Sequence, residues 1–183
     1  QGERLPVRPP QRQHAIERLQ PQVDALIVNA NRHLEAYAQF GLPTVADAQG
    51  DFAGPLAGML AGLRNCLTPY LATVPCDTPG YPLDLVRRLA AALDAPGARI
   101  AMAATRESSG RIQPQPVFCL LPLALREDLV SALAGGERKI DRWMALHGCA
   151  QLVFDDEHAF FNVNTLEDLA APEPTPSSSR PPR

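Results

Sequence analysis

The chain has 183 residues, 45% of them hydrophobic, and its formal net charge is only −3. This length and apolar content suit one domain with a sizeable core. The basic residues are dispersed, which argues against nucleic acid as a partner, and no apolar run approaches the roughly 20 residues of a membrane span.

The four cysteines lie far apart and form no C-x-x-C pair. This spacing argues against a zinc site and against a dense disulfide framework. The first residues also lack the apolar stretch of a signal peptide. We therefore expect reduced thiols and a cytoplasmic protein.

Composition divides the chain into three regions. Residues 1–13 are polar and Pro-rich and are predicted to be irregular or foreign to the fold. Residues 172–183 have the Pro/Ser bias of a flexible tail. A single domain is expected between them, over residues 14–171.

The first half of this domain alternates apolar runs with a helical pattern. Residues 24–30, 43–47 and 69–75 are predicted strands, because their apolar residues leave little or no polar face. Pro55 suits the first position of a helix. The apolar residues that follow it at helical spacing are Leu56, Met59, Leu60 and Leu63.

The second half continues the alternation. A helix after Pro82 is predicted to place Leu85, Leu89 and Leu93 on one face. The remaining predicted elements are strands at 99–105, 116–122 and 150–155 and helices at 123–134, 137–147 and 166–171. Strands that alternate with helices indicate an α/β fold with a mostly parallel sheet covered on both faces.

In such sheets ligands bind beyond the carboxyl ends of the strands, so the residues there are candidates for the site. Asn29 and Asn31 follow the first strand and could hydrogen-bond the edge of a base, with Arg32 offering charge to a phosphate. The alternative is a turn, which asparagine favours.

Two glycines surround the start of the helix after Pro55. Gly54 and Gly58 would let a ligand approach the backbone, and the helix would offer unpaired N–H groups to an anion. The alternative is an ordinary Gly-Pro helix start.

Carboxylate and amide side chains follow later strands. Asp77, at the end of the third strand, is a natural Mg²⁺ ligand beside a phosphate, or else the cap of a turn before Pro79. Asn162 and Asn164 are two residues apart and would face one site if extended, or else cap the next helix.

The motifs "NANR", "GPLAG", "PCDTP" and "NVNT", in this order, resemble the molybdenum cofactor guanylyltransferase family from about His14 to Ala171. The resemblance implies a Rossmann-like three-layer α/β sandwich of the nucleotide-diphospho-sugar transferase type. It also implies Mg²⁺-dependent transfer of GMP from GTP to molybdopterin, giving molybdopterin guanine dinucleotide and pyrophosphate. Molybdoenzymes or their chaperones would receive the product.

Site residues follow from the resemblance position by position. It assigns Asn29, Asp47, Gly54 and Gly58 to the guanine nucleotide. Asp77 becomes the catalytic residue that binds both metal and nucleotide. The remaining pair, Asn162 and Asn164, is assigned to the pterin.

The family begins with an apolar strand and a glycine-rich loop that holds the triphosphate, and neither occurs in this sequence. We interpret this as a truncated product or an altered amino terminus, and we expect the edges of the neighbouring strands to be exposed. A cytidylyltransferase acting on the same pterin, or a non-catalytic pterin-binding remnant, are the alternative functions.

Overall fold

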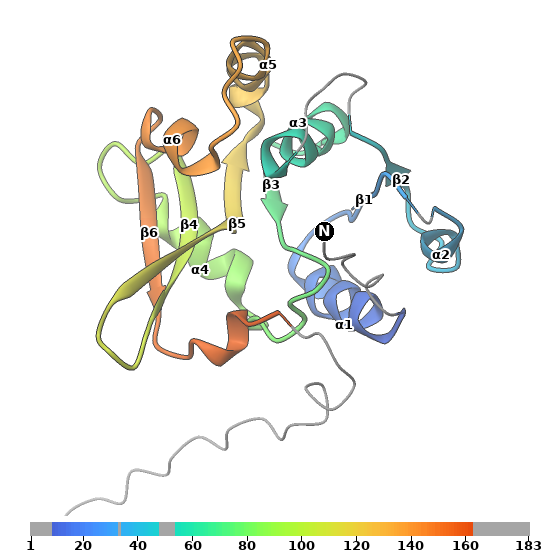
Figure 1. The fold of residues 1–183 in the computed structure, drawn as a ribbon, viewed down its shortest axis with the longest axis horizontal. Helices are drawn as coiled ribbons and strands as arrows, with labels where there is room; N and C mark the ends of the chain where they lie inside the picture. Colours follow the sequence, from blue (N-terminus) through green and yellow to red (C-terminus); the bar gives the residue numbers. More distant parts are fainter. Residues whose placement is uncertain (1–8, 33, 48–53, 163–183) are drawn as a thin grey trace, which may run out of the picture.

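The computed structural model describes residues 9–32, 34–47 and 54–162. The chain folds into a four-stranded sheet with helices on both faces, and a separate pair of short strands lies beside it (Figure 1). The elements in chain order are α1 (Pro9–Leu19), η1 (Gln20–Gln22), β1 (Val28–Asn29), α2 (Leu34–Ala38), β2 (Thr44–Val45), α3 (Pro55–Asn65), β3 (Tyr70–Thr73), α4 (Leu85–Ala92), β4 (Ile100–Arg106), β5 (Ile112–Pro122), η2 (Leu123–Leu125), α5 (Arg126–Ala134), α6 (Ile140–Ala145), β6 (Cys149–Phe154) and η3 (His158–Phe160).

The main sheet has the strand order β3-β5-β4-β6. β5 runs antiparallel to both β3 and β4, whereas β4 and β6 are parallel. Three of the four strands, β3, β4 and β6, therefore point in one direction and only β5 is reversed. The mostly parallel sheet is confirmed, and the reversed strand is new.

Two apolar layers cover the faces of this sheet, because successive side chains of a strand point to opposite faces. Ile100 and Met102 of β4 pack with α3, α5 and α6, whereas Ala101 and Ala103 pack with α4 and the segment around Phe160. The central strand β4 is buried from its first residue to Thr105. The predicted three-layer arrangement is thus confirmed.

Helix α1 corrects one expectation. It begins at Pro9, so residues 9–13, which we expected to be irregular, belong to the helix. Proline fits the first helical turn because the N–H that it lacks has no partner within the helix there. Residues 1–8 lie outside the described residues, as do the predicted helix at 166–171 and the tail.

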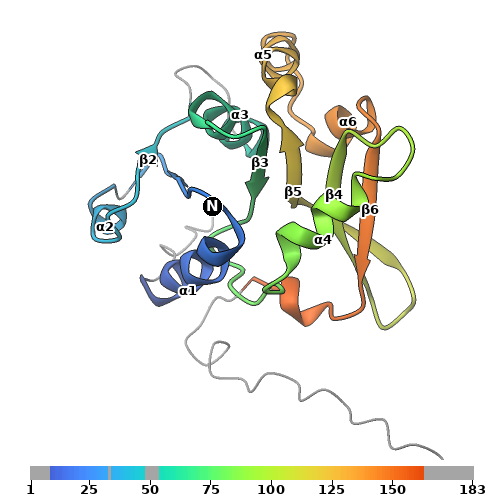
Figure 2. The ribbon, with the colours of Figure 1, turned by 180° about the vertical axis from the view of Figure 1, so that it is seen from behind.

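Strands β1 and β2 are shorter than predicted and pair with each other in parallel. In the part of the chain that the structure describes, no strand pairing joins β1 to β3 (Figures 1 and 2). In the described residues, the sheet is therefore divided between these two strands. Both of them line a pocket that lies between them.

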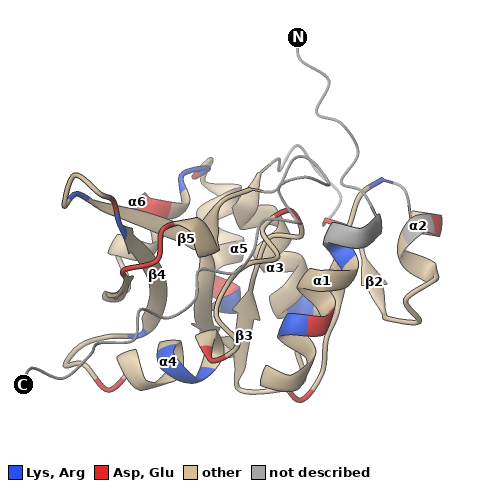
Figure 3. Cartoon of the chain, turned by 90° about the horizontal axis from the view of Figure 1, so that it is seen from below, with Lys and Arg blue, Asp and Glu red and all other residues tan. Residues whose placement is uncertain are grey.

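Among the described residues, Lys and Arg are scattered over several elements and lie among Asp and Glu (Figure 3). Among the described helices, none is long and apolar enough to cross a membrane.

Candidate functional site

The first polar cluster joins the ends of β1 and β2. Asn31 donates from its amide nitrogen to Asp47 Oδ2 at 2.6 Å, and the Asp47 backbone N–H donates to Asn31 Oδ1 at 2.8 Å. Asn29 donates to Asp47 Oδ1 at 2.9 Å and to the Val45 carbonyl at 3.2 Å. Two strand ends that are 16 residues apart thus hold one carboxylate between two amides.

Helix α3 begins beside this cluster. Gly54 precedes it with φ +109°, a conformation that side chains rarely adopt. No side chain caps the first turn, and Pro55 occupies the start of the helix. The Ala57 N–H donates to the Gly54 carbonyl at 3.1 Å, and an anion at this helix start stays a prediction.

Gly58 has a packing role that the sequence did not reveal. A Cβ atom at this position would lie 2.7 Å from Asn29 Oδ1, which is closer than real Cβ contacts. The absence of a side chain therefore lets α3 pack directly against the cluster of Asn29, Asn31 and Asp47.

The second polar cluster joins the segment after β3 to the end of the described chain. The hydroxyl of Thr78, which is fully buried, donates to Asn162 Oδ1 at 2.9 Å and lies 3.3 Å from Asp77 Oδ1. Asp77 and Asn162, which are 85 positions apart, are thus linked through one threonine. Asn164 lies outside the described residues.

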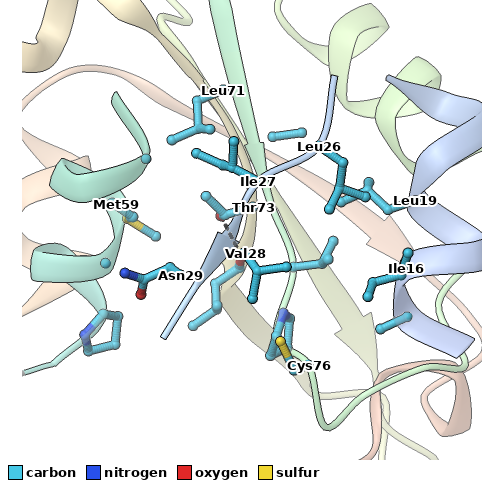
Figure 4. A pocket seen from close by; sticks show the side chains of 18 of the residues that line it. Ile16, Leu19, Leu26, Ile27, Val28, Asn29, Met59, Leu71, Thr73 and Cys76 are labelled. Atoms are coloured by element: carbon cyan, nitrogen blue, oxygen red, sulfur yellow. Dashed lines mark hydrogen bonds between the residues drawn. The ribbon is translucent and has the colours of Figure 1, made fainter. Parts of the chain in front are cut away.

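A pocket of about 290 Å³ opens between β1, β3, α1 and α3. Figure 4 shows Asn29 and Met59 on one side, Ile16 and Leu19 of α1 on the other, and Cys76 at one end. Asn29 of the first polar cluster lines the pocket, and so does Cys76, which directly precedes Asp77 of the second cluster. Most of its other lining residues are apolar.

Thiol chemistry at this pocket is disfavoured. Burial, and secondarily the Asp77 carboxylate, raises the pKa of the Cys76 thiol, although the Arg12 charge opposes this. Burial likewise raises the pKa of Tyr37, which is near Cys76. A protonated thiol is a poor nucleophile, so Cys76 does not suit covalent catalysis.

The structure limits how a metal could be held. The described residues include no group of three or more His, Cys, Asp or Glu side chains that could bind an ion. Asp77 is half-buried, and its Oδ2 atom takes part in none of the hydrogen bonds of these residues. Mg²⁺ is often held by one or two carboxylates, with phosphates and water completing the shell. Asp77 fits that mode.

Sequence reasoning missed two residues of this region. Thr78 is the link between Asp77 and Asn162, and the only available signal was a hydroxyl beside a candidate acid. Arg12 is buried and its guanidinium lies 4.4 Å from the centre of the Tyr37 ring. It lies in the segment that we expected to be irregular, so no pattern indicated it.

Comparison with known proteins shows where this architecture recurs. Residues 8–151 match the MobA-like NTP transferase domain. A molybdenum cofactor guanylyltransferase of Cupriavidus taiwanensis is 53% identical over 164 residues, which cover 90% of this chain and 82% of that protein.

Solved structures share the fold at low sequence identity. Molybdopterin-guanine dinucleotide biosynthesis protein A from Archaeoglobus fulgidus has a TM-score of 0.61 at 19% identity, covering 85% of this chain and 82% of its own. The 4-diphosphocytidyl-2C-methyl-D-erythritol synthase from Anaerococcus prevotii has a TM-score of 0.69 at 10% identity, covering 90% and 88%. The match to the family model and the 53% identical relative show that the chain belongs to the molybdenum cofactor guanylyltransferase family of nucleotidyltransferases.

Proposed function

We propose that this chain transfers GMP from GTP to molybdopterin and releases pyrophosphate. The observation that carries the proposal is the cluster of Asn29, Asn31 and Asp47, whose Asn29 lines a pocket that is also lined by Cys76, the residue before Asp77. The name of the close relative from Cupriavidus taiwanensis supports the nucleotide and the acceptor.

The first cluster suits guanine. Asp47 accepts one hydrogen bond on each carboxylate oxygen, and a carboxylate has about four acceptor positions. Guanine presents two adjacent donors, N1–H and the N2 amino group, whereas the corresponding edge of cytosine presents two acceptors and one donor. A fixed carboxylate therefore favours GTP over CTP. Gly54, which has open space beside it, would let the nucleotide lie close to the start of α3, and Gly58 acts by letting α3 pack against Asn29.

The second cluster suits the reacting phosphates. A terminal phosphate oxygen of molybdopterin attacks the α-phosphorus of GTP, the bond from that phosphorus to the bridging oxygen breaks, and pyrophosphate leaves. Asp77 would hold Mg²⁺, which when bound neutralises charge on the phosphates. Thr78 fixes Asp77 relative to Asn162, and we assign Asn162 and Asn164 to the pterin. No protein nucleophile is required.

The test is pyrophosphate release from GTP in the presence of Mg²⁺ and molybdopterin, in the cytoplasmic pH range. We expect D77N and D77A to abolish release, whereas D84N, which removes a surface carboxylate paired with Arg87, retains it. Circular dichroism controls for folding. Turnover of D77A at the wild-type rate would refute the metal assignment.

Competition between nucleotides tests the base assignment separately. Unlabelled GTP should displace labelled GTP at far lower concentration than CTP does. A preference for CTP would indicate a cytidylyltransferase, and pterin binding without any pyrophosphate release would indicate a non-catalytic binding module.

A further inference from the structure

Arg12 stands apart from every other charged residue that the structure describes, because it alone is buried. Its side chain and backbone together are only 5% exposed. Its Nε atom is shielded from solvent and has no hydrogen-bond partner. A guanidinium carries five N–H donors and stays charged at any physiological pH, so burial without an anion is unfavourable.

The neighbours of Arg12 do not supply that anion. The guanidinium lies over the ring of Tyr37, a cation–π contact that compensates only part of the lost hydration. Cys76 lines the same pocket and carries no carboxylate. Across residues 9–32, 34–47 and 54–162, no carboxylate forms an ion pair with Arg12.

A second feature of the same pocket also favours negative charge. Gly54 and Pro55, at the start of the 11-residue helix α3, line this pocket together with Arg12. That helix start has no side-chain cap, so the positive end of the helix dipole attracts an anion. A buried cation and an uncapped helix start thus share one cavity.

We propose that Arg12 binds the polyphosphate of the nucleotide in this pocket, which Asn29 of the first polar cluster also lines. The identity of the ligand as a nucleotide rests on the proposed function. The assignment of Arg12 as a cation that binds phosphate does not depend on that function. Arg12 is a binding residue in this account and takes no part in proton transfer.

The test compares R12M with the matched control R64M, in which an exposed arginine at the far end of α3 is replaced. Inorganic pyrophosphate and GTP are titrated calorimetrically into each protein. We expect R12M to bind both at least about tenfold more weakly than the wild type, whereas R64M binds like the wild type. Binding of pyrophosphate by R12M within about twofold of the wild type would overturn the inference.

Stability without ligand separates binding from a structural role. Methionine has a similar length and no charge, so R12M should unfold at the same or a higher temperature than the wild type. A marked fall in the unfolding temperature would make Arg12 a structural residue and would overturn the inference. Pyrophosphate should raise the unfolding temperature of the wild type but not that of R12M.

A measurement on the wild type keeps the inference testable if R12M does not fold. Pyrophosphate should protect Cys76, on the same pocket wall, from alkylation, as measured by peptide mass spectrometry. Unchanged alkylation would overturn the inference. If the wild type binds pyrophosphate through Arg12 but does not bind GTP, the anion site stands and the proposed function fails.

Discussion

Two glycines of helix α3 provide a matched pair of substitutions. G58A would place a Cβ atom 2.7 Å from Asn29 Oδ1, and G62A would place one 2.7 Å from Leu71 Cδ2. The two positions lie one helical turn apart in α3, and replacing glycine by alanine has the same intrinsic effect on helix stability at each. Their effects should differ because Asn29 is held in place by hydrogen bonds, whereas the end of the Leu71 side chain can move.

The magnitudes follow from these contacts. Alanine stabilises a helix relative to glycine by about 1 kcal/mol. In G58A, Asn29 must move and lose its hydrogen bonds to Val45 and Asp47, at about 1 kcal/mol each. In G62A, the end of Leu71 can turn into the adjoining pocket. We expect G58A to be less stable than G62A by about 2 kcal/mol.

Urea denaturation followed by the fluorescence of Trp143, the single tryptophan, measures this difference. In thermal unfolding it corresponds to about 4–8 °C. GTP affinity should fall in G58A, because the cluster that holds Asp47 is displaced. Equal stability of the two variants, with unchanged GTP binding by G58A, would refute the role assigned to Asn29.

Three further outcomes are expected. T78V should lower the free energy of unfolding by about 1 kcal/mol and slow pyrophosphate release, since Asn162 loses its donor; an unchanged rate would count against the link. Burial raises the pKa of Cys119 from 9.0 to about 12, so the unfolded chain loses this proton first. This contribution to the free energy of unfolding is therefore complete below pH 9 and falls by about 1.4 kcal/mol per pH unit above it. In urea denaturation at several pH values, the free energy of unfolding of C119A should fall less steeply with pH than that of the wild type. F160A should lower the free energy of unfolding by about 3–5 kcal/mol in the same assay, because the Phe160 ring packs against Phe118 in the core cluster that also contains Leu85 and Leu89 of α4.

The elements with clear periodicity were predictable from the sequence. The apolar residues of α3 recur at helical spacing, and Leu56, Met59, Leu60 and Leu63 are all buried as predicted. The reversal of β5 was not predictable from its apolar pattern, because a strand buried on both faces looks the same in either direction. The signal was the short turn before it, in which Gly110 has φ +84°.

Site residues were predictable by type but not by partner. Asn29, Asp47 and Asp77 stood out because each follows an apolar run. The hydrogen bonds that group them connect positions far apart in the sequence, such as Thr78 and Asn162, so they depend on tertiary structure alone. The burial of Arg12 likewise depends on how α1 packs, which composition does not reveal.

A crystal structure of the chain with GTP and Mn²⁺ tests the central claim most directly, because the anomalous signal of Mn²⁺ locates the metal. We expect the ion within about 2.1 Å of an Asp77 carboxylate oxygen, in contact with the phosphates, and the guanine edge on Asp47. A metal bound elsewhere, with Asp77 turned away from the phosphates, would contradict the account.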